Sequence, residues 1–275
     1  TATITGGSLV GVVSPDVVTL TQSGTFSDKN VGTTKTITST CTISGANAGN
    51  YTLTQPTLTA RDITPKALSI TAPTIVSKVY NGLATSGTVT VGTLSGFIGT
   101  ETVTTTATGL YSDVNVGTGK SATVTYTLVN GTNGGLATNY SLANGSATGN
   151  ITAAPLTIIG VTANNKIYDG NTVATLSGTP AYSGLQNGES FSVTGTPSAT
   201  FATATVGSGK AVTVTGYTAP TANYTVSQPT GLTANITALA LTVSGATTTN
   251  KVYDGTTTAT ITGGSLVGVV SPDVV

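Results

Sequence analysis

Histidine, methionine and tryptophan are absent from this 275-residue chain, and only 7% of its residues are charged. The lack of histidine removes the commonest general base and the commonest metal ligand, so the sequence predicts that the protein is not an enzyme. The nine acidic residues do not gather into the Asp-rich loops that bind calcium, so we expect no metal and no cofactor. The nine basic residues are spread along a chain of net charge +0, which argues against nucleic acid as a partner.

Long apolar runs are also missing. No stretch approaches the roughly 18 consecutive apolar residues of a spanning helix, so we expect no membrane span in this segment. The single cysteine, Cys41, rules out a disulfide within the segment, and we expect it to be a buried, small apolar side chain. A hydrophobic fraction of 37% without net charge is the reverse of the composition of disordered chains.

What the chain does contain is β-forming sequence. Threonine alternates with apolar residues in runs such as Ala122–Leu128 and Ala211–Tyr217, which is typical of strands with one packed face. Asn-Gly and Asp-Gly pairs between the runs mark tight turns. These signals predict an all-β fold built from Ig-like antiparallel β-sandwiches, with β-grasp-like repeats as the alternative.

The sequence repeats itself on two scales. Residues 1–18 recur without change as residues 258–275, an offset of 258 − 1 = 257, so we expect the chain to be one period of a longer array. Three shorter signatures recur about every 85 residues: Lys-x-Tyr-Asp/Asn-Gly, Val-Gly-Thr/Ser-x-Lys and an Asn-Tyr pair. We therefore predict a first repeat that lacks its first strands, two complete repeats and the start of a fourth, and we number them in chain order: 1–65, 66–154, 155–239 and 240–275.

The first signature supplies the candidate structural residues. They are Lys78, Tyr80, Asn81, Gly82, Lys166, Tyr168, Asp169, Gly170, Lys251, Tyr253, Asp254 and Gly255. The glycine suits a tight turn with positive φ, the tyrosine suits the end of a small sandwich, and the lysine stem suits an apolar surface. The alternative is an intramolecular isopeptide crosslink, which also needs a protonated carboxyl group; the acids, including Glu101 and Glu189, do not have equivalent places in the sequence.

These three signatures together resemble the YDG-type repeat of large bacterial surface proteins, including relatives of filamentous haemagglutinin. The resemblance covers nearly the whole chain, although Asn81 replaces the usual aspartate in one copy. It implies a secreted, extracellular or cell-surface protein of a Gram-negative-type bacterium. The implied function is that of a structural repeat segment in a long filament or adhesin stalk, which provides reach and tensile strength, as in biofilm and cell-adhesion proteins.

Other readings remain open. The repeats could instead be a multivalent adhesin module that binds carbohydrate or host protein, with exposed Tyr111, Tyr182 or Tyr217 as the candidate contacts. The expected partners are the neighbouring repeats of the same polypeptide, and strand edges could also associate laterally into thicker filaments. In a further variant, residues 240–275 donate strands to the first repeat of another molecule, although the duplicated 18 residues count against it.

Overall fold

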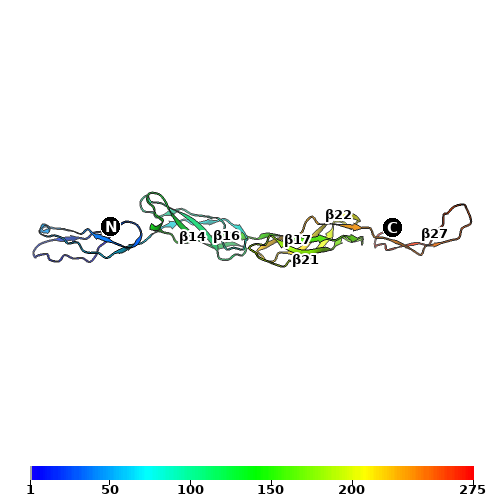
Figure 1. Cartoon of the computed structure of the whole chain (residues 1–275), viewed down its shortest axis with the longest axis horizontal. Helices are drawn as coiled ribbons and strands as arrows, with labels where there is room; N and C mark the ends of the chain where they lie inside the picture. Colours follow the sequence, from blue (N-terminus) through cyan, green and yellow to red (C-terminus); the bar gives the residue numbers. More distant parts are fainter. Residues whose placement is uncertain (1) are drawn as a thin grey trace. The chain divides into compact units, whose positions relative to one another are not determined.

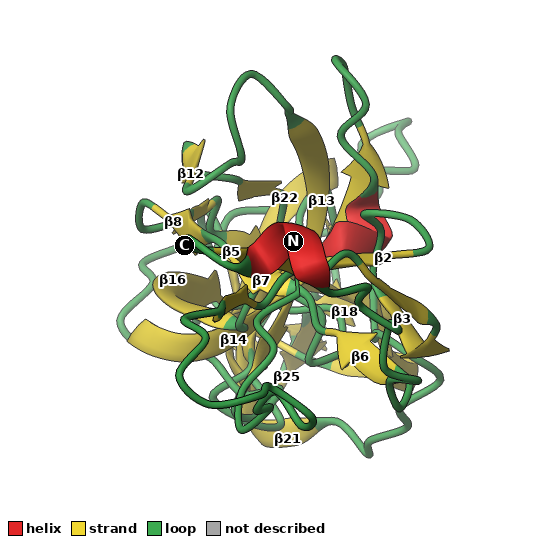
Figure 2. Cartoon of the chain, turned by 90° about the vertical axis from the view of Figure 1, so that its left-hand side faces the viewer, coloured by secondary structure: helices red, strands yellow, loops and turns green. Residues whose placement is uncertain are grey.

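The computed structural model describes residues 2–275 and confirms the all-β prediction. Within that range the helical elements are two 3-10 turns of 3 residues each, η1 (Ala48–Asn50) and η2 (Ala137–Asn139). Figure 2 shows them in red among strands and loops. Each turn ends at the asparagine of an Asn-Tyr pair, and the tyrosine that follows has an extended backbone conformation.

The chain divides into two compact bodies. The first comprises Thr1–Val76, Thr85–Ser112 and Lys120–Gly149, and the second comprises Ser77–Ala84, Asp113–Gly119 and Asn150–Val275. The division passes through the second predicted repeat. Each body therefore contains a place where one repeat meets the next, and the two bodies are described separately.

The first body contains short strand pairs and one long hairpin. Strand β13 pairs antiparallel with β14 from Val103–Asn130 to Tyr111–Ala122, and β14 and β16 are neighbours in their sheet (Figure 1). Both β14 (Gly117–Asn130) and β16 (Gly145–Thr152) also have residues in the second body. The remaining strands are β1 (Thr19–Thr21), β2 (Gly24–Phe26), β3 (Gly32–Lys35), β4 (Ile37–Ser39), β5 (Thr42–Ser44), β6 (Arg61–Ile63), β7 (Lys66–Ala67), β8 (Ser69–Ile70), β9 (Thr74–Ile75), β11 (Val89–Thr90), β12 (Leu94–Ser95), β13 (Val103–Tyr111) and β15 (Tyr140–Ser141).

The second body holds the whole of the third repeat. Its strands form a three-stranded sheet in the order β20-β17-β23 and a five-stranded sheet in the order β18-β24-β22-β21-β19; Figure 1 shows β17, β21 and β22 running together. The strands of this body are β10 (Lys78–Val79), β17 (Ala154–Ala163), β18 (Lys166–Ile167), β19 (Val173–Ala174), β20 (Leu176–Ser183), β21 (Thr194–Phe201), β22 (Gly207–Thr218), β23 (Tyr224–Ser227), β24 (Thr233–Thr237), β25 (Thr242–Ser244), β26 (Thr247–Thr248), β27 (Ile261–Thr262) and β28 (Ser265–Val267).

Alternate side chains of the third repeat are buried, as the sequence pattern indicates. On β17 the buried residues include Leu156 and Ile158, and on β22 they include Val212 and Val214, with threonines between them exposed. Each sheet therefore buries one face, which is the arrangement of a two-layer β-domain. In the first repeat Cys41 is buried, as predicted, and its Sγ contacts the Ser39 hydroxyl at 3.3 Å and the Ser23 carbonyl at 3.7 Å.

Strand pairing differs from the prediction in one respect. Most pairs are antiparallel, but β7 pairs in parallel with β15, β10 with β16, β17 with β23 and β18 with β24. The antiparallel pairing expected from the sequence therefore holds for most strands, and these four parallel pairs are additions that the sequence did not indicate. The parallel pairs join the first strands of a repeat to strands near its end, and such partners are too far apart along the chain for turn signals to reveal them.

The fourth repeat has little core. Its strands β25 to β28 are two or three residues long, and every side chain between residues 240 and 275 is exposed apart from that of Val270. Two-stranded pairs of this length are marginal in isolation. The motif residues Lys251–Gly255 in this part of the chain are therefore not covered by another repeat.

Candidate functional site

The Lys-x-Tyr-Asp/Asn-Gly motif forms a strand end followed by a tight turn. The glycines have φ angles of 72°, 78° and 69° at Gly82, Gly170 and Gly255. The lysine Nζ donates to the side-chain oxygen three residues on, at 2.8, 2.7 and 2.9 Å in Lys78–Asn81, Lys166–Asp169 and Lys251–Asp254. It also donates to a turn carbonyl, at 2.5, 2.7 and 2.7 Å in Lys78–Leu83, Lys166–Asn171 and Lys251–Thr256. The lysine therefore holds the turn closed.

The same contacts bear on the isopeptide alternative. The lysine to acid distances are those of hydrogen bonds, and the side chains of Asp169 and Asp254 are 48% and 55% exposed. Hydrogen bonding to Lys166 lowers the pKa of Asp169, and hydrogen bonding to Lys251 lowers that of Asp254, so both carboxylates favour the charged form. Burial lowers the pKa of Lys78. The crosslink stays the alternative to this structural role, and a mass deficit of one ammonia or water per repeat would establish it.

The three motif tyrosines have very different surroundings. Tyr80 is 3% exposed, Tyr168 is half-buried and Tyr253 is 94% exposed. The backbone N–H groups of Tyr80 and Tyr168 each donate to a threonine carbonyl at 2.8 Å, on Thr152 and Thr237. The motif strand is therefore placed alike in the second and third repeats, and what differs is the cover over the tyrosine ring.

At the junction of the second and third repeats, Glu189 joins two tyrosines. Its Oε1 accepts a hydrogen bond from the Tyr80 hydroxyl, and its Oε2 accepts one from the Tyr224 hydroxyl at 2.5 Å. The two rings meet edge to face with centroids 5.3 Å apart. The hydrogen bond to Glu189, followed by burial, raises the pKa of Tyr80 to about 12. Burial and then Glu189 also raise the pKa of Tyr224.

At the same junction, an asparagine of the third repeat binds the backbone of the second repeat. The Asn223 Oδ1 accepts the backbone N–H of Val116 at 2.9 Å, and its Nδ2 donates to Asn115 Oδ1 at 3.0 Å. Asn187 adds a longer contact of 3.4 Å to the carbonyl of Gly82. Third-repeat side chains thus reach both the motif turn and the Val-Gly-Thr loop of the repeat before.

The same asparagine contact is present at the junction of the first and second repeats. Asn139 Oδ1 accepts the N–H of Val31 at 2.9 Å, and its Nδ2 donates to Asn30 Oδ1 at 3.0 Å. Glu101 accepts the Tyr140 hydroxyl at 2.8 Å and pairs with Lys29 at 2.9 Å. The bond from Lys29, followed by that from Tyr140, lowers the pKa of Glu101. The Asn-Tyr signature is therefore a contact between consecutive repeats.

One acid per repeat has an equivalent place, contrary to the expectation from the sequence. Asp16 accepts the Tyr51 hydroxyl at 2.8 Å, as Glu101 and Glu189 accept those of Tyr140 and Tyr224. In the fourth repeat Asp273 accepts the hydroxyl of Tyr168 at 2.7 Å. The sequence comparison missed the set because the acid is aspartate after Ser-Pro in two repeats and glutamate in the others. The acid precedes the tyrosine of the Asn-Tyr pair by 51 − 16 = 35, 140 − 101 = 39 and 224 − 189 = 35 residues, so its spacing is similar but not constant.

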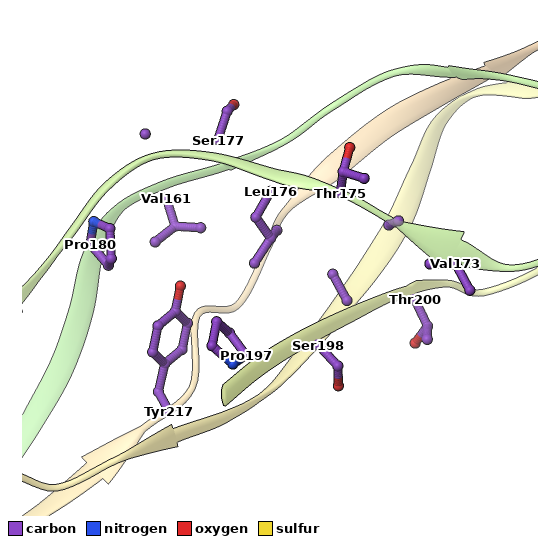
Figure 3. A pocket seen from close by; sticks show the side chains of 13 residues that line it. Val161, Val173, Thr175, Leu176, Ser177, Pro180, Pro197, Ser198, Thr200 and Tyr217 are labelled. Carbon is purple, nitrogen blue, oxygen red and sulfur yellow. The ribbon is translucent and has the colours of Figure 1, made fainter. Parts of the chain in front are cut away.

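The tyrosines predicted as exposed binding contacts are buried. Tyr111, Tyr182 and Tyr217 are 2%, 8% and 7% exposed, so that prediction is wrong. Each ring lies on the packed side of its strand, where its apolar body is out of water. The buried ring of Tyr217 also forms part of the wall of a groove of about 640 Å³ in the third repeat, beside Val161, Leu176 and Pro197 (Figure 3).

Within residues 2–275, no three His, Cys, Asp or Glu side chains lie together in a group that could hold a metal ion. No helix in that range combines the length and the apolar character that a membrane crossing requires.

Comparison with known proteins identifies one family. The model of the YDG domain matches four successive stretches, residues 1–59, 64–148, 152–231 and 237–275. No curated protein and no solved structure matches the chain. The junction residues Asn139, Tyr140, Asn223 and Tyr224 therefore connect consecutive copies of one domain, while the repeat boundaries at 65, 154 and 239 stay a prediction.

Proposed function

The chain belongs to the YDG domain family, and from this premise we propose that it is a structural repeat segment of a long extracellular bacterial filament or adhesin stalk. Its role is to provide reach and tensile strength. The observation that carries the proposal is the pair of matching junctions, in which Asn139 and Asn223 bind the preceding repeat through the same atoms. Contacts that recur at these two junctions suit a chain in which every repeat performs the same mechanical task.

The two ends of the third repeat support a head-to-tail order. One end presents Glu189, Asn223 and Tyr224 to the second repeat, and the other presents Tyr168 to Asp273 of the fourth. Because the two contact surfaces differ, each added repeat leaves the next surface open, so the number of repeats has no built-in limit. Such an arrangement needs no catalytic group and no cofactor.

Stiffness is the physical quantity that the proposal requires. A joint held by backbone hydrogen bonds, paired amides and a carboxylate between two tyrosines restricts rotation more than a Gly/Ser tether does. The extracellular location and the bacterial surface context form part of the proposal, and they rest on the resemblance of the motifs.

Small-angle scattering of the 275-residue chain tests this stiffness. We expect a scattering profile that fits repeats held at fixed angles. The double variant Tyr80→Ala, Asn223→Ala should shift the profile toward that of freely hinged repeats, while the matched variant Tyr253→Ala leaves it unchanged. A wild-type profile that already requires free hinges at the junctions would contradict the proposal.

The alternative function, a multivalent adhesin module, has one feature in its favour. The groove in Figure 3 is open and mainly apolar, with Pro180, Pro197 and Tyr217 among its lining residues. A glycan array probed with the chain and with Leu176→Asp tests it. Binding that the substitution removes would support this alternative, and an array without signal would exclude carbohydrate as the ligand under the conditions used.

A further inference from the structure

Two strand pairs of the third repeat are interrupted at the same short sequence. Gly-Thr-Pro occurs twice in the chain, at residues 178–180 and 195–197. The first copy lies at the register shift between β17 and β20, and the second lies at the register shift between β21 and β22. The pair β13 and β14, which corresponds to β21 and β22 in the second repeat, has no shift. Both Gly-Thr-Pro bulges therefore belong to the third repeat.

Glycine at each bulge lets the paired backbones approach closely. An added Cβ at Gly178 would lie 2.2 Å from the carbonyl oxygen of Gly160, and at Gly195 it would lie 2.1 Å from that of Gly216. A side chain at either position would force the paired strands apart. The two bulges are therefore written into the sequence, and bulges often redirect the side chains beside them.

The groove of about 640 Å³ in Figure 3 lies beside both bulges, because Pro180 and Pro197 are among its lining residues. All of the lining comes from residues 161–217, within one repeat and one compact body. The groove is therefore formed by the third repeat itself, and no junction contributes to it.

The strand edges along the groove are poor templates for an added strand. Strand β20 is the outer strand of its sheet, and among the described residues β21 pairs on its second side only through Ala199 and Thr200. Each of these edges carries one of the two prolines, which has no N–H to donate to a further strand. Side chains, rather than backbone pairing, must therefore hold an occupant.

Those side chains are uncharged. Each of the 13 lining residues is apolar or carries at most a hydroxyl group, and Val161 and Leu176 supply apolar surface together with the two prolines. An ionised ligand would lose hydration here without meeting an opposite charge. The lining therefore favours an uncharged ligand.

One buried polar group in the groove wall has no partner. Tyr217 is 7% exposed, and its backbone N–H and carbonyl bond to the Gln228 side chain at 3.0 and 2.8 Å. Its hydroxyl has no hydrogen-bond partner among residues 2–275, and Figure 3 shows it directed toward Val161 and Leu176. By contrast, the Tyr182 hydroxyl donates to the carbonyl of Thr218. The Tyr217 hydroxyl is therefore a donor that only solvent or a ligand can satisfy.

We propose that this groove binds a small uncharged molecule with an apolar body and one carbonyl oxygen. The body packs on Leu176, Pro180 and Pro197, and the carbonyl oxygen accepts the Tyr217 hydroxyl. The volume lies within the range of small-molecule sites. A carbohydrate fits less well, because the apolar lining would leave many of its hydroxyls unpaired. This inference goes beyond the proposed function, because it assigns a ligand to one repeat rather than a mechanical role to all.

Fluorescence titration of the whole chain with two neutral probes provides the test. The first probe is prodan, a dimethylaminonaphthalene that carries a propionyl ketone, and the second is dimethylaminonaphthalene without the ketone. We expect saturable binding of prodan with a blue-shifted emission. Tyr217→Phe keeps the ring and removes the donor, so it should weaken prodan binding about tenfold and leave binding of the second probe unchanged.

The second repeat offers the matched control. Tyr126 lies on β14 at the place that corresponds to Tyr217, but its hydroxyl is buried, and an added Cβ at Gly145 would lie 2.6 Å from it. Tyr126→Phe should therefore leave the binding of both probes unchanged. An equal loss of both probes in Tyr217→Phe would overturn the assigned hydrogen bond.

A charge placed in the groove tests the apolar lining. Leu176→Asp should weaken the binding of both probes about 30-fold, because the carboxylate would have to be desolvated beside the ligand. Thr213→Asp is the control, since Thr213 is exposed on β22 and outside the lining, and it should change nothing.

Three outcomes would overturn the proposal. They are the absence of saturable binding by either probe, binding that both Tyr217→Phe and Leu176→Asp leave intact, and a glycan-array signal that Leu176→Asp removes from a chain that binds neither probe. The last result would assign the groove to carbohydrate instead. None of them bears on the scattering test of junction stiffness.

Discussion

The two junctions share one contact and differ in another. In both, an asparagine of the later repeat binds the backbone and the asparagine side chain of the earlier one, at 2.9 and 3.0 Å. In the second–third junction Glu189 binds two tyrosines, whereas in the first–second junction Glu101 binds one tyrosine and the exposed Lys29. The comparison teaches that the asparagine sets the register of the joint, and the motif tyrosine supplies its buried core.

Among the substitutions considered, removal of the Tyr80 ring should produce the largest difference in stability between the two junctions. Truncating a buried aromatic side chain costs about 3–5 kcal/mol, so Tyr80→Ala should lower the free energy of unfolding of the second–third junction by an amount of this order. Hydrogen exchange at Glu189 and Tyr224 would report the local loss. Tyr253→Ala is the control, because its ring is 94% exposed and its removal should leave exchange unchanged.

Replacement of the junction acids Glu189 and Glu101 should have the second largest effect on junction stability. Glu189→Ala leaves two tyrosine hydroxyls without their carboxylate acceptor, at about 1–3 kcal/mol for each buried donor. Glu101→Ala does so for Tyr140 alone and should destabilise its junction less. Chemical denaturation followed separately at the two junctions by hydrogen exchange would measure both. Equal losses would show that Tyr80 draws little stability from Glu189.

Replacement of the asparagines should make the two junctions behave alike. Asn139→Ala and Asn223→Ala each remove two hydrogen bonds across a junction, at about 1 kcal/mol for each bond. We expect equal losses of unfolding free energy, measured by the same exchange experiment. A clear difference between the two variants would mean that the shared contact does not carry equal weight in both junctions.

The stability of the two junctions should depend on pH in different ways. Near neutral pH we expect no change in either junction. Tyr80 has its pKa raised to about 12, so its contribution is complete below its unfolded pKa near 10 and is lost as pH rises toward 12. Glu101 has a lowered pKa, so its contribution is present above the unfolded pKa near 4.3 and is lost as pH falls further. Alkali should therefore loosen the second–third junction and acid the first–second one. Exchange protection measured across the pH range tests this, and a common pH dependence would contradict it.

Local signals predicted the parts of the fold that depend on local physics. Alternation gave the strands, Asp-Gly and Asn-Gly gave the turns, and the burial of Cys41 was confirmed. Alternation could also have placed Tyr111 inside, since it shares the phase of the buried Val103 on β13. Alternation could not have predicted the burial of Tyr217. The buried residues of β22 have even numbers up to Val214, but Gly216 has a φ of 96° and interrupts the alternation, so the next buried residue is the odd-numbered Tyr217.

The junction contacts needed information that the alternation does not hold. The acids Glu101 and Glu189 lie about 35 to 39 residues before their tyrosines, in loops whose lengths and residue types differ between repeats. Nothing in the local sequence shows that Asn223 reaches Val116, which lies 107 residues away along the chain. Such partners are chosen by the way two folded repeats meet.

The amino-acid order alone established the β class, the repeat period and the turn at each Lys-x-Tyr-Asp/Asn-Gly motif, because these follow from side-chain alternation, identity between copies and the φ angles that glycine permits. The folded molecule decided which tyrosine is covered and which is not. Tyr80 and Tyr253 stand in the same five-residue motif, yet one is buried and the other exposed. A motif tyrosine is buried only where the surface of another repeat covers its ring, and the five residues of the motif carry no information about that surface.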